Sequence, residues 1–301
     1  MSDLKLFRIS TSAVREERVT SVALEKSLQT LIERHLDEIL GIKFLASEFS
    51  TGKDHAGRID TLGIDENGFP AIIEYKRSLN QNVINQGLFY LDWLLDHRGD
   101  FKTLVVDRYG NSVADKIDWS SPRLLCISGD FNKHDEYAVK QIDRNIQLIR
   151  YRKYGEELLL LELINQPSAP PLIFDSGTVV DKKSRVKTAL EQLDSSPTEV
   201  KDLFESLRAF CVALGDDVQM NTLKFYFAFR RMKNFACVVP HQRFLSIFVP
   251  VDPETIVLRE GFTRDVRQID HLGTGKLEIR LETDRDLEEA KNLLLTAYEN
   301  S

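Results

Sequence analysis

The chain has 301 residues, of which 42% are hydrophobic and 29% charged, and its formal net charge is -7. This composition excludes a wholly disordered chain, and the length suggests two domains of about 150 residues each. The densest apolar run, 158–164, is interrupted by Glu162. It is far shorter than the roughly 18 residues that a membrane span needs, so we expect no membrane partner.

Three cysteines, Cys126, Cys211 and Cys237, are widely spaced and form no C-x-x-C pair. We therefore expect neither a structural zinc site nor a redox pair. A reducing cytoplasm fits this cysteine usage best, and no basic segment followed by an apolar run indicates a signal peptide at the start. The mild net acidity does not exclude nucleic-acid binding, which depends on local charge.

The first part of the chain, residues 1–165, has the mixed periodicity of an α/β domain. In chain order we predict a helix at 21–40 ending at Gly41, a strand at 42–49, an antiparallel hairpin of strands 58–64 and 69–76, a helix at 82–95, strands at 103–106 and 124–127, a helix at 135–144, and strands at 146–151 and 158–163.

A proline-rich segment separates this part from the rest. Pro167, Pro170 and Pro171 favour an extended connector, and we place a linker at 166–182. The remaining residues, 183–301, predict a smaller α+β domain in which helices flank an antiparallel sheet. Its predicted elements are helices at 184–193 and 197–214, the second capped by Ser196 with Pro197 at its first position, strands at 222–229, 235–239, 244–249 and 277–281, and a final helix at 286–298.

The hairpin of the first domain brings two acidic residues together. If 66–68 is a three-residue loop with Gly68 in the left-handed conformation, Asp65 pairs with Phe69 and Asp60 faces Glu74. Side chains directly opposite each other share one face of the sheet. A two- or four-residue loop would shift the pairing and separate the carboxylates.

Two opposed carboxylates repel each other unless a cation lies between them. Asp60, Glu74 and the backbone carbonyl of Tyr75 could supply three oxygen ligands to Mg²⁺ or Mn²⁺. Lys76 points to the same face and could hold or help to deprotonate a metal-bound water. The alternative is a solvated hairpin face on which Glu74 and Lys76 are surface charges.

The segments Gly57-Arg58-Ile59-Asp60 and Glu74-Tyr75-Lys76-Arg77 resemble the core motif of the PD-(D/E)XK nuclease superfamily. The similarity is to the NucS-like endonuclease branch and covers about residues 20–155. Gln86 and Tyr90, at i and i+4, match the downstream Gln-x-x-x-Tyr of that branch. Tyr75 departs from the family, in which an aliphatic residue is commoner.

The resemblance implies a restriction-endonuclease-like α/β core and metal-dependent hydrolysis of DNA phosphodiesters, in DNA repair or defence. It implies that Asp60 and Glu74 bind the metal together with the Tyr75 carbonyl. Lys76 would position the water, and Gln86 would support the phosphate or the metal site. The family also has an acidic side chain on the preceding helix, which Glu25 or alternatively Glu48 would supply. We expect Arg58, Arg77 and Tyr90 to contact nucleic acid, with packing in the core as the alternative for Tyr90.

A second candidate for nucleic-acid contact lies in the C-terminal domain. Residues 221–250 contain no Asp or Glu, and Arg230, Arg231 and Lys233 cluster at a predicted hairpin turn among aromatic residues. Such a surface could neutralise phosphates, although aromatic residues also alternate along any half-buried sheet. Three features, the strand-turn-strand Phe227-Ala228-Phe229-Arg230-Arg231-Met232-Lys233-Asn234-Phe235, the segment 269–275 and the final helix, resemble a bacterial domain of unknown function labelled "predicted transport protein". Nothing in the sequence supports the transport label.

The sequence thus predicts a cytoplasmic, Mg²⁺- or Mn²⁺-dependent DNA endonuclease, with DNA favoured over RNA as partner. The alternative is a non-catalytic nucleic-acid-binding or partner-recruiting protein that retains the nuclease fold. Intact Asp60, Glu74 and Lys76 favour catalysis, because adjacent carboxylates weaken phosphate binding unless a cation is present. The oligomeric state stays open, a homodimer included.

Overall fold

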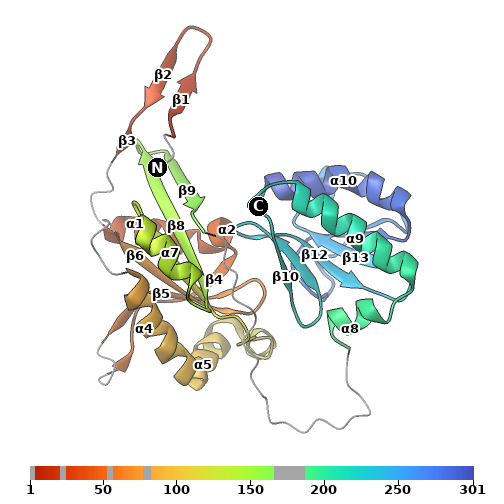
Figure 1. Cartoon of the computed structure of the whole chain (residues 1–301), viewed down its shortest axis with the longest axis horizontal. Helices are drawn as coiled ribbons and strands as arrows, with labels where there is room; N and C mark the ends of the chain where they lie inside the picture. Colours follow the sequence, from red (N-terminus) through yellow and green to blue (C-terminus); the bar gives the residue numbers. More distant parts are fainter. Residues whose placement is uncertain (1–3, 21–24, 53–56, 77–82, 166–186) are drawn as a thin grey trace. The chain divides into compact units, whose positions relative to one another are not determined.

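The computed structural model describes residues 4–20, 25–52, 57–76, 83–165 and 187–301. The chain divides into two compact units, residues 1–174 and 175–301, which are described separately (Figure 1). The first unit is a mixed α/β structure and the second is smaller. The division falls inside the predicted linker 166–182, a segment outside the described residues.

Four antiparallel pairings and two parallel ones build a seven-stranded sheet in the first unit. The strand order is β3-β8-β7-β6-β5-β4, and β9 also pairs with β8; β6, β7 and β8 run parallel. The described elements of this unit are β1 (Leu6–Ile9), β2 (Val14–Glu17), β3 (Val19–Thr20), α1 (Glu25–Arg34), α2 (Leu36–Leu40), β4 (Ile42–Ser50), β5 (Arg58–Asp65), β6 (Pro70–Lys76), α4 (Val83–Asp96), α5 (Arg98–Tyr109), α6 (Asn111–Ala114), β7 (Arg123–Ser128), α7 (Lys133–Lys140), β8 (Asn145–Tyr154) and β9 (Leu158–Leu163).

The β5–β6 hairpin has the predicted register. Asp65 N donates to Phe69 O at 2.8 Å, and Ile64 pairs with Pro70. Gly68 has a φ of 86°, the left-handed conformation that glycine adopts at no steric cost. The three-residue loop is therefore confirmed, and the regular ladder continues as far as Thr61 opposite Ile73.

Helices cover both faces of this sheet. Alternate strand residues, among them Leu62 and Ile72, form one core cluster with residues of α4, α5 and α7. The intervening residues point to the other face, where Thr61 donates to Glu33 of α1. The hairpin thus lies between α1 and α4, and both helices contribute to the site described below.

Three sequence predictions for this unit were wrong in part. Residues 103–106 belong to α5 rather than to a strand, because Phe101 and Val105 are buried one helical turn apart and this packing overrides β-propensity. The helix predicted at 21–40 is divided at His35 into α1 and α2, and Gly41 ends it as predicted, with a φ of 64°. The short strands β1, β2 and β3 were not predicted.

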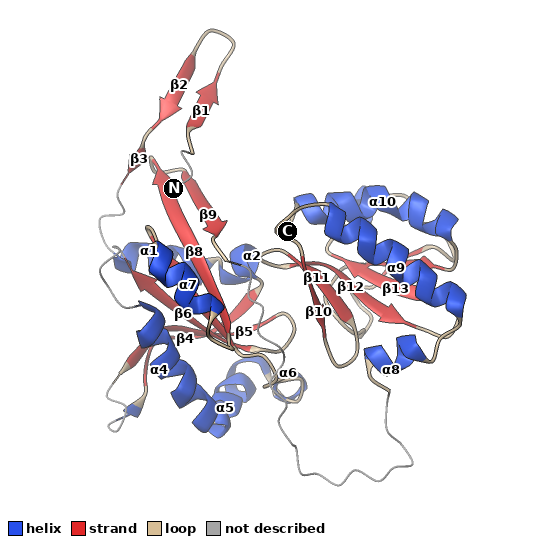
Figure 2. Cartoon of the chain, in the orientation of Figure 1, coloured by secondary structure: helices blue, strands red, loops and turns tan. Residues whose placement is uncertain are grey.

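The second unit is an antiparallel six-stranded sheet with helices on one face. The strand order is β10-β11-β12-β13-β15-β14, and α9 and α10 lie side by side over the sheet (Figure 2). Its described elements are α8 (Ala189–Asp194), α9 (Thr198–Ala213), β10 (Gln219–Thr222), β11 (Phe227–Arg230), β12 (Asn234–Pro240), β13 (Leu245–Val249), η1 (Pro253–Thr255), β14 (Thr263–Asp265), β15 (Leu277–Leu281) and α10 (Asp284–Glu299). This agrees with the predicted α+β arrangement.

Two local predictions for this unit were wrong. The strand predicted at 222–229 is two strands, because a turn in which Leu223 N donates to Tyr226 O separates β10 from β11. Ser196 does not cap α9, since its hydroxyl donates to Gln192 O at 2.8 Å and Pro197 is the capping residue. Of the helix predicted at 184–193, only 189–193 are helical within the described residues.

Among the residues that the structure describes, no helix combines the length and the apolar character needed to cross a membrane.

Candidate functional site

Asp60 and Glu74 lie beside each other just beyond the regular part of the β5–β6 ladder. The backbone N–H of Asp60 donates to Oε1 of Glu74 at 3.1 Å, and Oδ2 of Asp60 accepts from the N–H of Tyr75 at 3.0 Å. Each carboxylate thus replaces a backbone acceptor at the point where the strands separate. Glu74 is fully buried, and its Oε2 has no hydrogen-bond partner among the described residues.

Burial makes the charged form of this pair unfavourable. Burial, and then the charge of Asp60, raise the pKa of Glu74 to about 9. Burial also raises the pKa of Asp60, against the opposing effects of the Tyr75 hydrogen bond and the Lys76 charge. Near neutral pH the pair therefore holds a proton unless another positive charge replaces it.

Lys76 and Glu25 form an ion pair next to the carboxylates. Nζ of Lys76 is 3.5 Å from Oε1 of Glu25, the first residue of α1. The Lys76 side chain is only 15% exposed, so it is held close to the site rather than extended into solvent. Lys76 is the last residue of β6, two positions beyond Glu74, and therefore lies at the same end of the sheet as the two carboxylates.

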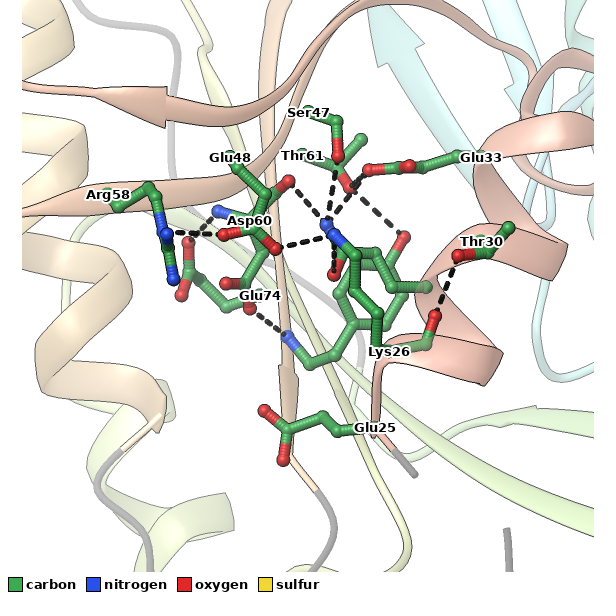
Figure 3. A network of polar contacts seen from close by, with 12 residues as sticks. Glu25, Lys26, Thr30, Glu33, Ser47, Glu48, Arg58, Asp60, Thr61 and Glu74 are labelled. Atoms are coloured by element: carbon green, nitrogen blue, oxygen red, sulfur yellow. Dashed lines mark hydrogen bonds and ion pairs between the residues drawn. The ribbon is translucent and has the colours of Figure 1, made fainter. Parts of the chain in front are cut away.

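A second cluster of charges centres on Glu48 of β4. Oε1 of Glu48 is 2.6 Å from Nζ of Lys26, and its Oε2 is 2.5 Å from Nε of Arg58 (Figure 3). The hydrogen bond from Lys26 lowers the pKa of Glu48, which keeps the carboxylate ionised. In the β4–β5 register, Glu48 and Asp60 lie between the pairs Ser47–Thr61 and Phe49–Ile59, so Glu48 lies next to Asp60.

Gln29 of α1, which the sequence analysis missed, lies against the backbone of Asp60. Its side chain is 3% exposed, and Nε2 donates to the carbonyl oxygen of Asp60 at 2.7 Å and to Oε1 of Glu33 at 3.0 Å. Thr61 also donates to Glu33, at 2.6 Å. This network fixes α1 to the backbone of Asp60. The available signal was the i, i+4 spacing of Glu25, Gln29 and Glu33 beside the apolar stripe of the helix.

Gln86 and Tyr90 of α4 approach the other side of the hairpin. The hydroxyl of Tyr90 accepts from Nε2 of Gln86 at 3.2 Å and from the backbone N–H of Arg58 at 3.1 Å. Tyr90 is 5% exposed, which fits the packing alternative for this residue. A Cβ at Gly57 would lie 2.5 Å from its ring, so the close approach depends on glycine.

Six of the predicted site residues line one cavity of about 630 Å³, and the buried Glu74 is not among its lining residues. It is lined by Glu25, Lys26, Gln29, Glu48, Ser50, Gly57, Arg58, Asp60, Lys76, Gln86 and Tyr90. The side chain of Tyr75 is buried and turns to the other face, where its hydroxyl lies 3.5 Å from Oγ1 of Thr61. Arg77 lies outside the described residues.

These residues fit a hard divalent cation in part. Among the described residues, no group of three or more His, Cys, Asp and Glu side chains is arranged to hold a metal ion. The partnerless Oε2 of buried Glu74 and the raised pKa values of both carboxylates are nonetheless features that a cation would relieve. Mg²⁺ needs only one or two carboxylates, because it keeps several of its waters.

The basic cluster of the second unit has partners within the protein. Arg230 is 2% exposed, and its Nη2 donates to Met232 O at 2.7 Å. Arg231 pairs with Asp217 at 2.6 Å and lies over the ring of Tyr298. The turn between β11 and β12 is confirmed, but a buried Arg230 stabilises this turn instead of presenting its charge to a ligand. Nucleic-acid contact by Arg231 and Lys233 stays a prediction.

Comparisons with known proteins identify relatives of unassigned function. Residues 189–301 match the family "Domain of unknown function (DUF5655)". The chain is 27% identical over 305 residues to an "Uncharacterized protein" of Haemophilus influenzae (strain ATCC 51907 / DSM 11121 / KW20 / Rd), a match that covers 99% of this chain and 100% of the relative. The relative therefore contains counterparts of both units.

A solved structure described as "Structure of EndoMS-dsDNA2 complex" is similar to part of the chain. The match has a TM-score of 0.25 and 18% sequence identity, and it covers 45% of this chain. It spans about half of the other chain, 49%.

Proposed function

We propose that the protein is a metal-dependent nuclease that hydrolyses DNA phosphodiester bonds, with a restriction-endonuclease-like core in its first unit. The observation that carries this proposal is the Asp60–Glu74 pair, in which a buried carboxylate oxygen without a partner faces a second carboxylate. The backbone hydrogen bonds use one oxygen of each carboxylate, so they do not by themselves require a second buried acidic group here. Asp60 and Lys76 line a cavity whose other charged lining residues are Glu25, Lys26, Glu48 and Arg58.

Each residue of the site has a separate role in this proposal. Asp60 and Glu74 would hold Mg²⁺ or Mn²⁺, with the Tyr75 carbonyl as a further oxygen. A bound cation of this kind lowers the pKa of its water and stabilises negative charge on a phosphodiester oxygen. Lys76 holds the attacking water in place, Glu25 keeps the Lys76 ammonium aligned at 3.5 Å, and Gln86 supports the phosphate.

The test is incubation of the purified chain with a panel of labelled nucleic acids. The panel contains single-stranded, duplex, mismatched and branched DNA and the corresponding RNAs, each with Mg²⁺, with Mn²⁺ and with EDTA. We expect fragments from DNA only when a divalent cation is present, and none from Asp60→Asn. Binding without cleavage by the wild type under all conditions would favour the non-catalytic alternative.

A further inference from the structure

Lys26 and Arg58 are two cations from different elements that converge on one carboxylate. Lys26 lies on α1 and Arg58 begins β5, and both contact Glu48, at 2.6 and 2.5 Å. Their side chains are 55% and 68% exposed and line the cavity beside Asp60. An ammonium and a guanidinium that can reach one carboxylate can also reach one phosphate group, because both anions present paired oxygens.

The backbone conformation of Glu48 is unusual for a residue other than glycine. Among the described non-glycine residues, Glu48 alone has a positive φ, of 53°. A glutamate in this conformation is strained, because its Cβ lies close to the backbone, and such strain concentrates at functional sites. The local fold tolerates this strain and places the Glu48 carboxylate between Lys26 and Arg58 in the cavity lining.

We infer that Lys26 and Arg58 form a subsite for a phosphate group of the nucleic-acid strand, and that Glu48 fills this subsite as an internal counter-ion until the phosphate displaces it. This inference rests on the proposed function, since it assumes a nucleic-acid substrate. The phosphate concerned belongs to the strand beside the bond that faces Asp60 and Glu74. Lys76 in the same cavity pairs with Glu25, whereas the ion pairs of Lys26 and Arg58 are both with Glu48.

The test measures binding of a labelled single-stranded oligonucleotide by fluorescence anisotropy in EDTA, across a salt series. Lys26→Ala and Arg58→Ala should each weaken binding and reduce the slope of log K against log salt by about 0.7, the value for one phosphate contact on a single strand. Glu48→Gln should tighten binding about two- to tenfold, because exposed ion pairs are weak competitors. Glu48→Asn should do the same, since asparagine tolerates a positive φ and its shorter side chain reaches neither cation.

The exposed pair of Lys102 and Asp115, 3.3 Å apart, provides matched controls. Lys102→Ala and Asp115→Asn make the same charge changes away from the cavity and should leave affinity and slope unchanged. In the Lys26→Ala, Arg58→Ala background, Glu48→Gln should no longer tighten binding, because the subsite is gone.

The inference is overturned if Glu48→Gln weakens binding, which would make Glu48 part of the cation site or a scaffold. It is equally overturned if Lys26→Ala and Arg58→Ala match the controls, or if the wild type does not bind in EDTA. Cleavage of the same oligonucleotide in Mg²⁺ tests the proposed function separately. If the protein cleaves the oligonucleotide but fails the binding tests, the phosphate subsite is refuted and the proposed nuclease function stands.

Discussion

The backbone N–H of Asp60 donates a hydrogen bond to Oε1 of Glu74 across the β5–β6 hairpin. This bond exists because the three-residue loop sets the register, and because the ladder separates after Thr61 and Ile73. The two carboxylates are therefore held in place by backbone groups before any ligand arrives.

Asp60→Asn and Glu74→Gln should each abolish metal-dependent cleavage and leave the fold intact. The amides keep an oxygen for the hydrogen bonds from the N–H groups of Tyr75 and Asp60. Without metal, the melting temperature should be equal to or above that of the wild type, because the amide is neutral in this buried position without taking up a proton. Cleavage assays and thermal melts in EDTA check this prediction, and wild-type cleavage by either variant would refute the site assignment.

Lys76→Ala should bind metal as the wild type does and lose about 10²–10⁴-fold in turnover, the usual contribution of a group that handles a proton. Isothermal titration with Mn²⁺ and single-turnover cleavage separate the two effects. Lys102→Ala is a control for loss of a surface lysine. If Lys76→Ala lost metal affinity as severely as Asp60→Asn, Lys76 would belong to the metal site instead of to the water.

The stability of the metal-free protein should fall as the pH rises from about 5 towards 9. The pKa of Glu74 is raised from 4.5 to about 9, so over this interval the folded protein holds a proton that the unfolded chain has released. Glu74→Gln has no such proton to lose. At about pH 8 it should be more stable than the wild type by on the order of 1 kcal/mol or more, or about 2–4 °C in a domain of this size. Parallel pH profiles of melting temperature would contradict the raised pKa.

Gly68→Ala should destabilise the first unit by about 1–3 kcal/mol, because φ is 86° and a Cβ would lie 2.4 Å from the Lys116 carbonyl oxygen. Gly99→Ala is the matched control. Gly99 lies in α5, where a Cβ meets no described atom within 4 Å, and the substitution should stabilise by about 0.4–1 kcal/mol. Urea unfolding measures both, and equal effects would argue against the hairpin loop.

Residues 1–165 should fold alone and keep the metal site, since Asp60, Glu74, Lys76 and Gln86 all belong to the first unit. Circular dichroism and Mn²⁺ titration of this fragment check the prediction.

In the full chain, Arg231→Ala with Lys233→Ala should weaken duplex binding and reduce the salt slope by about 0.9 per contact, while buried Arg230 is left in place. An unchanged affinity and slope would favour a partner-recruiting role for the second unit.

Short-range signals explain why the hairpin was predictable. Gly68 and its neighbours define the loop, and the loop defines the register that places Asp60 opposite Glu74. Gly41 likewise ends α2 as its position predicts. In each case one residue with special backbone freedom determines the local geometry.

The features that the sequence did not reveal depend on tertiary contacts. Residues 103–106 are rich in β-formers, but the burial of Phe101 and Val105 against one core makes them helical. The network of Gln29 depends on Asp60, which is distant in the sequence. The buried position of Arg230 depends on how the turn brings the Met232 carbonyl to its guanidinium. The positive φ of Glu48 is a property of its place in β4 and has no residue-type signal.

The most direct test of the central claim is a single-turnover chase. The protein is first bound to end-labelled DNA in EDTA, excess Mg²⁺ is then added, and the products are separated on a denaturing gel. The account predicts that Mg²⁺ triggers strand cleavage by the wild type, and that Asp60→Asn and Glu74→Gln yield no fragments from the same complex. Equal cleavage by these variants, or intact DNA with the wild type after Mg²⁺ addition, would contradict it.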